Sequence, residues 1–253
     1  MIKIETNEIN IKIIGLGGIG SWLLPIIAKY ARFTMLQNKK ITITCIDGDS
    51  YDSLNRPRQN FQNLGNKARI KSLELQDEYN RYVPSGYVLD KFVLNYIDEY
   101  VTEDNIKDLI LDEDTIFLCV DNHKSRSIVS KHCETLDNII LISGGNDITV
   151  GNVQIFQQKG GVSVTADLCR YHPEIGDPQD KAPYEKSCEE LQESLPQLLF
   201  TNAMVAVLMG CAYYNLLVGK IDYNNPVGEA YFNIETLKCE SYLRKPKNKT
   251  EGE

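Results

Sequence analysis

The first 150 residues of the chain alternate short apolar runs with amphipathic segments. Runs rich in β-branched residues are typical of buried strands, whereas apolar residues that recur every three or four positions predict helices. The predicted strands span residues 11–15, 41–47, 87–94, 115–120 and 139–143, and the predicted helices span residues 21–33, 67–82, 105–111 and 124–136. Strands that alternate with helices predict an α/β fold, Rossmann-like and doubly wound, with a mainly parallel sheet.

The pattern changes after residue 150. The elements predicted there are a strand at 152–157, a polar and irregular stretch at 162–194, a long helix at 196–220, and two C-terminal antiparallel strands at 229–234 and 239–243. Long irregular stretches of this kind often carry function. The chain shows no internal repeat and no linker. We therefore expect one domain, residues 1–244, followed by a charged and disordered tail, residues 245–253.

Residues 194–219 contain no charged side chain, so this stretch has to be considered as a membrane span. A span needs about 20 mostly apolar residues. Here Pro196, Asn202 and Asn215 interrupt the apolar run. We expect instead a helix buried in the core or at a subunit interface, and no membrane partner.

Composition narrows the classes of function further. The 253 residues include 27 Lys and Arg against 35 Asp and Glu, which gives a formal net charge of −8. This charge provides no electrostatic footprint for a nucleic-acid backbone, so we expect no nucleic acid as a partner. The chain has seven cysteines, an odd number, and its first residues show no basic region followed by an apolar stretch, so we expect no signal peptide. We therefore expect reduced thiols and a cytoplasmic protein.

A glycine-rich turn carries the first chemical signal. Gly15, Gly17, Gly18 and Gly20 follow the first predicted strand and open the first predicted helix. Glycines at this spacing let the backbone turn tightly and approach a phosphate at the helix N-terminus. Asp47 ends the second predicted strand, where a carboxylate accepts hydrogen bonds from a ribose. Taken alone, the motif indicates an NAD-dependent dehydrogenase; the alternative is a turn without a ligand.

Polar and basic residues just beyond the second predicted strand change that interpretation. They are Asp49, Asn55, Arg58, Gln59 and Lys67. A dinucleotide does not need such a cluster. A triphosphate does, because guanidinium groups bind phosphate oxygens in bidentate geometry and a lysine adds a point charge. The alternative is that these basic side chains form a solvated surface.

Asp121 and Asn122 directly follow the strand predicted at 115–120. The carboxyl ends of parallel strands form the edge at which open α/β sheets bind ligands. A carboxylate that faces phosphates there is a natural Mg²⁺ ligand. The alternative is that one of the two residues caps the helix predicted at 124–136.

Together these motifs resemble the ThiF/MoeB family, the bacterial relatives of ubiquitin-activating enzymes. From about residue 11 to residue 145 the pattern is G-x-G-G-x-G, D-x-D, N-x-x-R-Q, a lysine that opens the next helix, and V-D-N with Arg126 beyond it. A dehydrogenase does not have the middle three elements. The sequences Ser187-Cys188 and Phe200-Thr201-Asn202 look like the ThiF-type proteins of PRTRC mobile-element systems.

The resemblance implies an ATP-dependent adenylyltransferase. Its reaction would join AMP to the C-terminal glycine carboxylate of a ubiquitin-like (β-grasp) protein and release pyrophosphate, in a homodimer. The alternatives are another carboxylate, such as that of a peptide or a modified nucleoside, and a silent nucleotide-binding partner subunit. The implied roles are adenosine binding by the four glycines, Asp47 and Asp49; triphosphate binding by Asn55, Arg58 and Lys67; support by Gln59 and Asn122; and Mg²⁺ binding by Asp121.

The chain departs from the family in two places. About ten residues precede the first strand, and none is an arginine able to reach the ATP of a partner subunit, so the source of that arginine stays open. The family's two C-x-x-C pairs are missing. Cys169, His172 and Cys188 would supply only three ligands, and structural zinc sites have four, so we do not expect zinc.

Cys188 is the candidate nucleophile. In the family, a cysteine in this crossover region can attack the acyl-adenylate, and an exposed loop suits a reactive thiolate. The alternative is a structural or idle thiol. Cys45 and Cys119 lie inside predicted strands and Cys211 lies in the uncharged helix, so we expect all three in the core.

Overall fold

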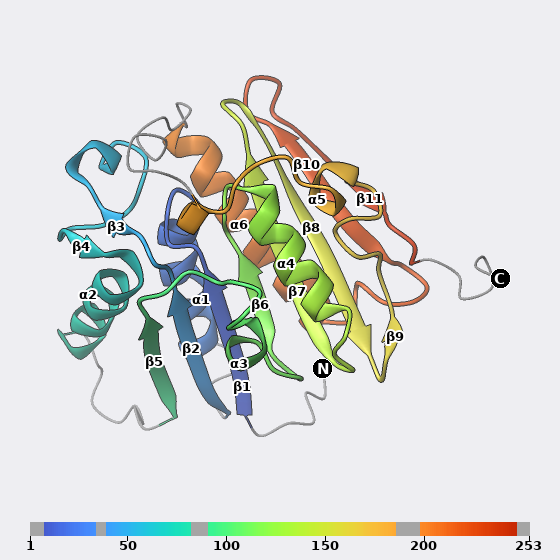
Figure 1. The fold of residues 1–253 in the computed structure, drawn as a ribbon, viewed down its shortest axis with the longest axis horizontal. Helices are drawn as coiled ribbons and strands as arrows, with labels where there is room; N and C mark the ends of the chain where they lie inside the picture. Colours follow the sequence, from blue (N-terminus) through green and yellow to red (C-terminus); the bar gives the residue numbers. More distant parts are fainter. Residues whose placement is uncertain (1–7, 34–38, 82–90, 186–197, 247–253) are drawn as a thin grey trace.

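One mixed sheet with helices on both faces organises the molecule (Figure 1). The computed structural model describes residues 8–33, 39–81, 91–185 and 198–246, and nine strands of these residues form the sheet. They are β1 (Glu8–Ile14), β2 (Lys40–Ile46), β5 (Phe92–Ile97), β6 (Thr115–Leu118), β7 (Ile139–Asn146), β8 (Val150–Lys159), β9 (Val162–Ser163), β10 (Val227–Asn233) and β11 (Lys238–Leu243). The order is β11-β10-β8-β7-β6-β1-β2-β5, with β9 paired to β8.

The parallel half of the sheet has a topological switch point. Strands β7, β6, β1, β2 and β5 run parallel to one another. The chain steps outward from β1 to β2 and β5, then returns to β6 on the other side of β1. The carboxyl ends of β1 and β6 lie side by side, with Ile14 next to Leu118. Ligands of open α/β sheets bind at such a crevice.

Two helical layers cover the sheet (Figure 1). Alternating side chains of the strands pack into one or the other of two hydrophobic cores beneath these layers. The α-helices are α1 (Gly20–Phe33), α2 (Lys67–Arg81), α3 (Ile106–Leu109), α4 (His123–Cys133), α5 (Pro173–Gly176) and α6 (Leu199–Leu217). Phe117 of β6 packs with the core under α1, α2 and α6, whereas Ile116 and Leu118 pack with the core under α3, α4 and α5. This alternation is the period of a strand buried on both faces.

The predicted fold class is confirmed: a mainly parallel doubly wound sheet is extended by antiparallel β8, β10 and β11. The strand predicted at 87–94 is displaced, because β5 pairs with β2 over Phe92–Ile97. The polar region just beyond the second predicted strand contains β3 (Ser50–Tyr51), which pairs with β4 (Gly65–Asn66), and a 3₁₀ turn (Ser53–Asn55).

The stretch predicted as irregular, 162–194, is well packed as far as residue 185. Its buried apolar residues include Val164, Leu168, Ile175 and Ala182. The regular elements described in this stretch are short, namely β9, α5 and a 3₁₀ turn (Pro183–Glu185), so no strand or helix period runs through it. The last part of the stretch, with Cys188, lies outside the described residues.

Helix α6 is buried on one side only. It packs against α1, β7 and β8. The opposite side leaves an apolar stripe exposed, which we call the α6 stripe: Phe200, Met204, Val207, Cys211 and Tyr214. The core prediction is confirmed for Cys45 and Cys119, but it is wrong for Cys211, which is exposed. An uncharged helix does not have to be buried all round. Within the described chain, α6 alone is long and apolar enough to cross a membrane, but its packing on the sheet accounts for that composition.

Candidate active site

The turn between β1 and α1 lies at the switch point and is pressed against the end of β6. Gly15 has φ +87°, and a Cβ atom there would lie 3.0 Å from the backbone carbonyl of Cys119. A Cβ on Gly20 would lie 1.9 Å from the carbonyl oxygen of Gly15. Only glycine fits both positions. The turn therefore brings the N-terminus of α1 to the carboxyl edge of the sheet, where its N–H groups and dipole favour an anion.

Asp47 braces this turn from the end of β2. Its Oδ2 accepts a hydrogen bond from the Leu16 N–H at 2.6 Å, and its Oδ1 accepts one from the Asp49 N–H at 2.9 Å. Burial raises the pKa of Asp47, and nearby Lys67 opposes that rise. The Tyr51 hydroxyl donates to the carbonyl oxygen of Leu16 at 2.7 Å. The Leu16 peptide is thus held on both sides, which fixes the turn that the sequence assigned to the nucleotide.

Lys67 is held next to the same edge by Asp49. Its backbone N–H donates to the Asp49 carbonyl at 2.8 Å, and its ammonium lies 2.5 Å from Asp49 Oδ2. The Lys67 side chain is only 9% exposed, whereas that of Asp49 is 47% exposed. A largely desolvated cation therefore stands at the start of α2, paired with a carboxylate that water or a ligand can reach.

Arg58 extends from a loop that two helices fasten. The carbonyl oxygen of Asn55 accepts hydrogen bonds from the N–H groups of Arg58 and Gln59. The carbonyl oxygen of Arg58 accepts from Trp22 Nε1 on α1 at 3.2 Å and from Asn202 Nδ2 on α6 at 3.3 Å. Gln59 is buried beside Gly17, where a Cβ would lie 3.8 Å from its Nε2. We call residues 55–60 the clamp loop.

Asp121 and Asn122, just after β6, were predicted to bind Mg²⁺ or to cap the next helix, and the structure assigns the cap to Asn122. Asn122 caps α4, because its Oδ1 accepts the Ser125 N–H at 2.8 Å. Asp121 is exposed. Arg126, buried beneath, donates to the carbonyl oxygens of Val120 and Gly144. Burial lowers the pKa of Arg126, and the Asp121 carboxylate opposes that shift. The cap needs only Asn122, so the Asp121 carboxylate stays available for a ligand.

The residues present suit a Mg²⁺ ion that arrives with phosphates. Protein sites of this kind use one or two carboxylates, and the substrate phosphates and water complete the octahedron. Asp121 supplies one exposed carboxylate at the sheet edge. In the described part of the chain no three His, Cys, Asp or Glu side chains gather into a metal site of their own. The fit is therefore to a metal shared with a nucleotide, not to a dedicated metal cage.

Three buried polar atoms around this edge lack a hydrogen-bond partner among the described residues. They are Gln59 Oε1, Asn122 Nδ2 and Asn202 Oδ1. Each such atom costs about 1–3 kcal/mol if it stays unsatisfied. Their concentration beside the glycine turn, the clamp loop and Asp121 is what a site shaped for a polar ligand requires.

Two segments flank the carboxyl edge of the sheet. One contains Tyr100, and the other follows α5 and contains Asp180 and Tyr184. The Tyr100 ring lies so close to Gly48 that a Cβ there would be 2.6 Å from it. Burial raises the pKa of Tyr100 to about 12, and Asp49, Asp47 and Asp121 add to the rise. Tyr184 packs against Tyr100 with ring centroids 6.4 Å apart. Asp180 accepts hydrogen bonds from the N–H groups of His123 and Lys124 at the start of α4.

Comparison with known proteins identifies the family to which this chain belongs. A model of the ThiF family matches residues 4–252. The chain belongs to the ThiF family. No curated protein matches it. The resemblance drawn from the motifs is thus confirmed.

Solved structures share the fold of this ThiF-family chain. They include E. coli MccB with MccA-N7isoASN (TM-score 0.65, 15% identity, 94% of this chain and 65% of that chain) and E. coli MccB with ATP (0.65, 14%, 94% and 64%). PaaA is similar as well (0.62, 16%, 94% and 65%). The chain spans about 65% of the length of these proteins. At such identities the likeness establishes the fold.

The structure brings several of the predicted site residues together, and their roles stay predictions. The ThiF-family fold brings the glycine turn, Asp47, Asp49 and Lys67 together, and it sets Asp121 at the neighbouring strand end. Cys188 lies outside the described residues, so its role stays a prediction. Sequence reasoning missed the supporting residues Tyr51, Tyr100, Asp180, Ser21 and Trp22. These residue types carry no motif, and their contacts exist only once the chain has folded.

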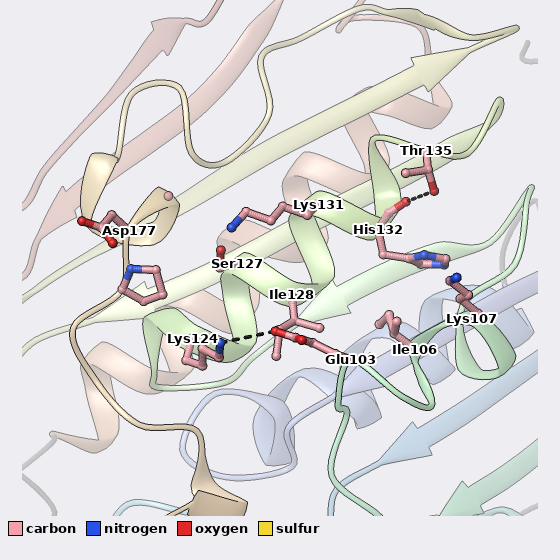
Figure 2. A pocket seen from close by; sticks show the side chains of 12 residues that line it. Glu103, Ile106, Lys107, Lys124, Ser127, Ile128, Lys131, His132, Thr135 and Asp177 are labelled. Carbon is pink, nitrogen blue, oxygen red and sulfur yellow. Dashed lines mark hydrogen bonds and ion pairs between the residues drawn. The ribbon is translucent and has the colours of Figure 1, made fainter.

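A pocket of about 490 Å³ lies on the outward face of α4, away from the strand ends (Figure 2). Lys107, Lys124 and Lys131 line it together with the carboxylates Glu103 and Asp177. Glu103 pairs with Lys124 at 3.3 Å. In α4, Arg126 points the other way, to the sheet. The pocket is therefore separate from the ThiF-family nucleotide edge.

His172 is engaged by two carboxylates. Its Nδ1 lies 2.8 Å from Glu174 Oε1, and its Nε2 lies 2.7 Å from Glu229 Oε1. The Glu229 bond does most to raise the pKa of His172 above its usual value. Burial opposes the shift at Glu229, but hydrogen bonds from His172, Tyr231 and Arg244 lower its pKa to about 2. The Nε2 contact thus ties the start of α5 to β10, whereas the Nδ1 contact stays within the first turn of α5.

This contact predicts a pH-dependent stability. Protonated His172 stabilises the folded state below its ordinary pKa of about 6.5, and the contribution is lost as the pH rises through the raised folded-state pKa. We expect the Tm difference between the wild type and His172→Gln to shrink by about 2–4 °C from pH 6 to pH 9, measured by thermal unfolding. His123→Gln, at an exposed histidine, should show no such change. A difference that stays constant with pH would contradict the prediction.

Proposed function

We propose that this chain uses MgATP to adenylate a carboxylate and release pyrophosphate. One observation carries the proposal: the Gly15 turn contacts the end of β6 two residues before Asp121, while Asp47 and Asp49 tie the same turn to Lys67. A binding surface for adenosine, a cation for phosphates and a carboxylate for a metal therefore meet at one edge. A nicotinamide enzyme needs only the first of these.

The residues would divide the work as follows. The glycine turn and the N-terminus of α1 receive the α-phosphate, and Arg58 and Lys67 neutralise the outer phosphates. Bound at Asp121, Mg²⁺ would supply charge neutralisation and phosphate orientation. A substrate carboxylate oxygen attacks the α-phosphorus in line, the bond to the bridging oxygen breaks, and pyrophosphate leaves. This displacement needs positioning and charge neutralisation rather than a covalent catalyst.

For the substrate, we propose the C-terminal glycine of a ubiquitin-like protein, as the ThiF/MoeB resemblance implies. A second candidate is the carboxylate of another polypeptide. It is supported by the MccB structures, which hold selenomethionine-labelled or N-formylated MccA. A silent nucleotide-binding subunit is less well supported, because Arg58, Lys67 and Asp121 are all present at the edge. Transfer of the acyl group to Cys188 would follow adenylation.

The test is ATP–pyrophosphate exchange. Exchange should be at background without a carboxylate and should rise with the true substrate. The panel is a β-grasp protein that ends in glycine, the same protein with an amidated C-terminus, and peptides with free or amidated C-termini. Exchange that the free C-terminus supports and the amide does not would establish the reaction. Exchange with none of them, together with NADH oxidation, would contradict it.

We also propose a homodimer through the α6 stripe. Phe200 is 73% exposed and Val207 45% exposed on a helix with no charge, an arrangement costly in water unless a second copy covers it. Val207→Glu should convert a dimer to a monomer in sedimentation velocity, by burying charge in an apolar interface. Leu237→Glu, at a residue that is 89% exposed away from α6, should leave the dimer intact. A wild-type monomer at micromolar concentration would contradict the proposal.

A further inference from the structure

The first turn of α6 connects two loops that lie far from it in the sequence. Asn202 is fully buried, and its Nδ2 donates to the carbonyl oxygen of Arg58, 144 residues away. Thr201, its neighbour, is also fully buried, and its Oγ1 donates to the carbonyl oxygen of Ile148 at 2.6 Å, in the connection from β7 to β8. Consecutive side chains of one helix turn therefore hold the clamp loop and the β7–β8 hairpin.

The Arg58 carbonyl is an anchor point shared by two helices. Trp22 Nε1 of α1 donates to it as well, at 3.2 Å. One residue earlier on α1, Ser21 Oγ accepts the N–H of Asn60 at 3.0 Å. A single carbonyl that receives two side-chain donors from different helices cannot rotate freely. The peptide from which the Arg58 side chain extends is therefore fixed relative to the glycine turn, because α1 begins at that turn.

The chemistry of Asn202 indicates more than packing. Its Oδ1 is buried and has no hydrogen-bond partner among the described residues. A buried amide satisfied at one end only is less stable than an apolar side chain of the same shape, unless the bond it makes is needed or a ligand completes it. The bond it does make is to the loop that carries the phosphate-binding arginine.

We propose that Asn202 and Trp22 are positioning residues for the phosphate clamp: they set the Arg58 peptide so that its guanidinium meets the outer phosphates of ATP. The inference rests on the proposed function, since it assigns Arg58 to the triphosphate. ATP affinity must depend on both donors, whereas AMP affinity must not, because AMP lacks the phosphates that Arg58 meets.

The chain offers a built-in reporter. Trp22 is its single tryptophan, and the indole N–H is the group that bonds Arg58. Tightening of the clamp loop on the triphosphate should change the emission of Trp22 in the wild type. AMP should leave this emission nearly unchanged.

Calorimetry on the full chain tests the inference with MgATP and with AMP. Asn202→Leu removes one donor and Trp22→Phe removes the other while keeping an aromatic ring. Each should weaken ATP binding about tenfold and AMP binding less than about twofold, the loss expected for one positioned hydrogen bond. Asn215→Leu, on the same helix at a residue with no comparable bond to the clamp loop, should bind both nucleotides like the wild type.

The outcomes are distinguishable. Equal weakening of ATP and AMP, or no weakening of either, would overturn the positioning role. If Asn202→Leu does not fold, Trp22→Phe still decides the matter, because its ring preserves the packing. A wild-type chain that binds neither nucleotide would instead contradict the proposed function, before any variant is compared.

Discussion

Replacement of Asp121 by asparagine should lower ATP–pyrophosphate exchange by about 1000-fold. Asn122 already caps α4, so the exposed Asp121 carboxylate has no structural bond to lose among the described residues. The amide keeps the size of the side chain but removes the charge that a Mg²⁺ ligand needs. Loss of preorganised charge on a phosphoryl group typically costs factors of 100–1000 or more in rate.

Two controls make the Asp121 experiment specific. In EDTA, Asp121→Asn should bind ATP at least as tightly as the wild type, because no metal then masks the Asp121 carboxylate, which repels the phosphates. Asp108→Asn removes an exposed carboxylate from α3, which precedes β6 and so lies at the amino end of the strands, and should leave exchange unchanged. Exchange by Asp121→Asn within about twofold of the wild type would exclude Asp121 as the metal ligand.

Local chemistry explains why much of the site was predictable. Gly15 and Gly20 are required by backbone geometry within one turn, and Asp47 follows its strand directly. The uninterrupted apolar run that forms β6 predicts a buried strand, and both faces of β6 are buried. Such constraints act within a few residues of sequence, so a pattern records them.

The residues of the site that could not be predicted from the sequence are those held by long-range contacts. Tyr100 reaches the site from a distant segment, and nothing in its neighbourhood distinguishes it from other polar residues. Asn202 belongs to the Phe200-Thr201-Asn202 motif, but the motif does not show its bond to Arg58, 144 residues away. Cys211 shows the converse: a helix without charges predicts burial, but α6 buries only the side that faces α1 and the sheet. What an open apolar side contacts is decided by a second surface, which the sequence of one chain does not describe.

The Lys67–Asp49 pair poses a question that only the structure raises. A triphosphate clamp needs a free cation, yet Lys67 is paired with Asp49 at 2.5 Å. Asp49 is half exposed, so incoming phosphates can compete for the ammonium while the carboxylate turns to water. In the absence of nucleotide, the Asp49 carboxylate stabilises the Lys67 ammonium, because a largely buried charge without a partner would destabilise the fold. On the proposed function, the ion pair is the nucleotide-free state, in which Asp49 neutralises Lys67 until phosphates replace it.

Lys67→Met should therefore lower exchange about 100-fold, with most of the loss in ATP affinity. The variant removes a cation from the phosphates and leaves the Asp49 carboxylate to repel them. Lys67→Met/Asp49→Asn should regain about fivefold in ATP affinity over the single variant, because the repulsion is removed. Lys71→Met is the matched control: it removes a buried lysine one turn along α2 that pairs with Glu74 instead. If Lys67→Met lowers only the Tm, as Lys71→Met is expected to do, the pair is structural and Lys67 does not bind phosphate.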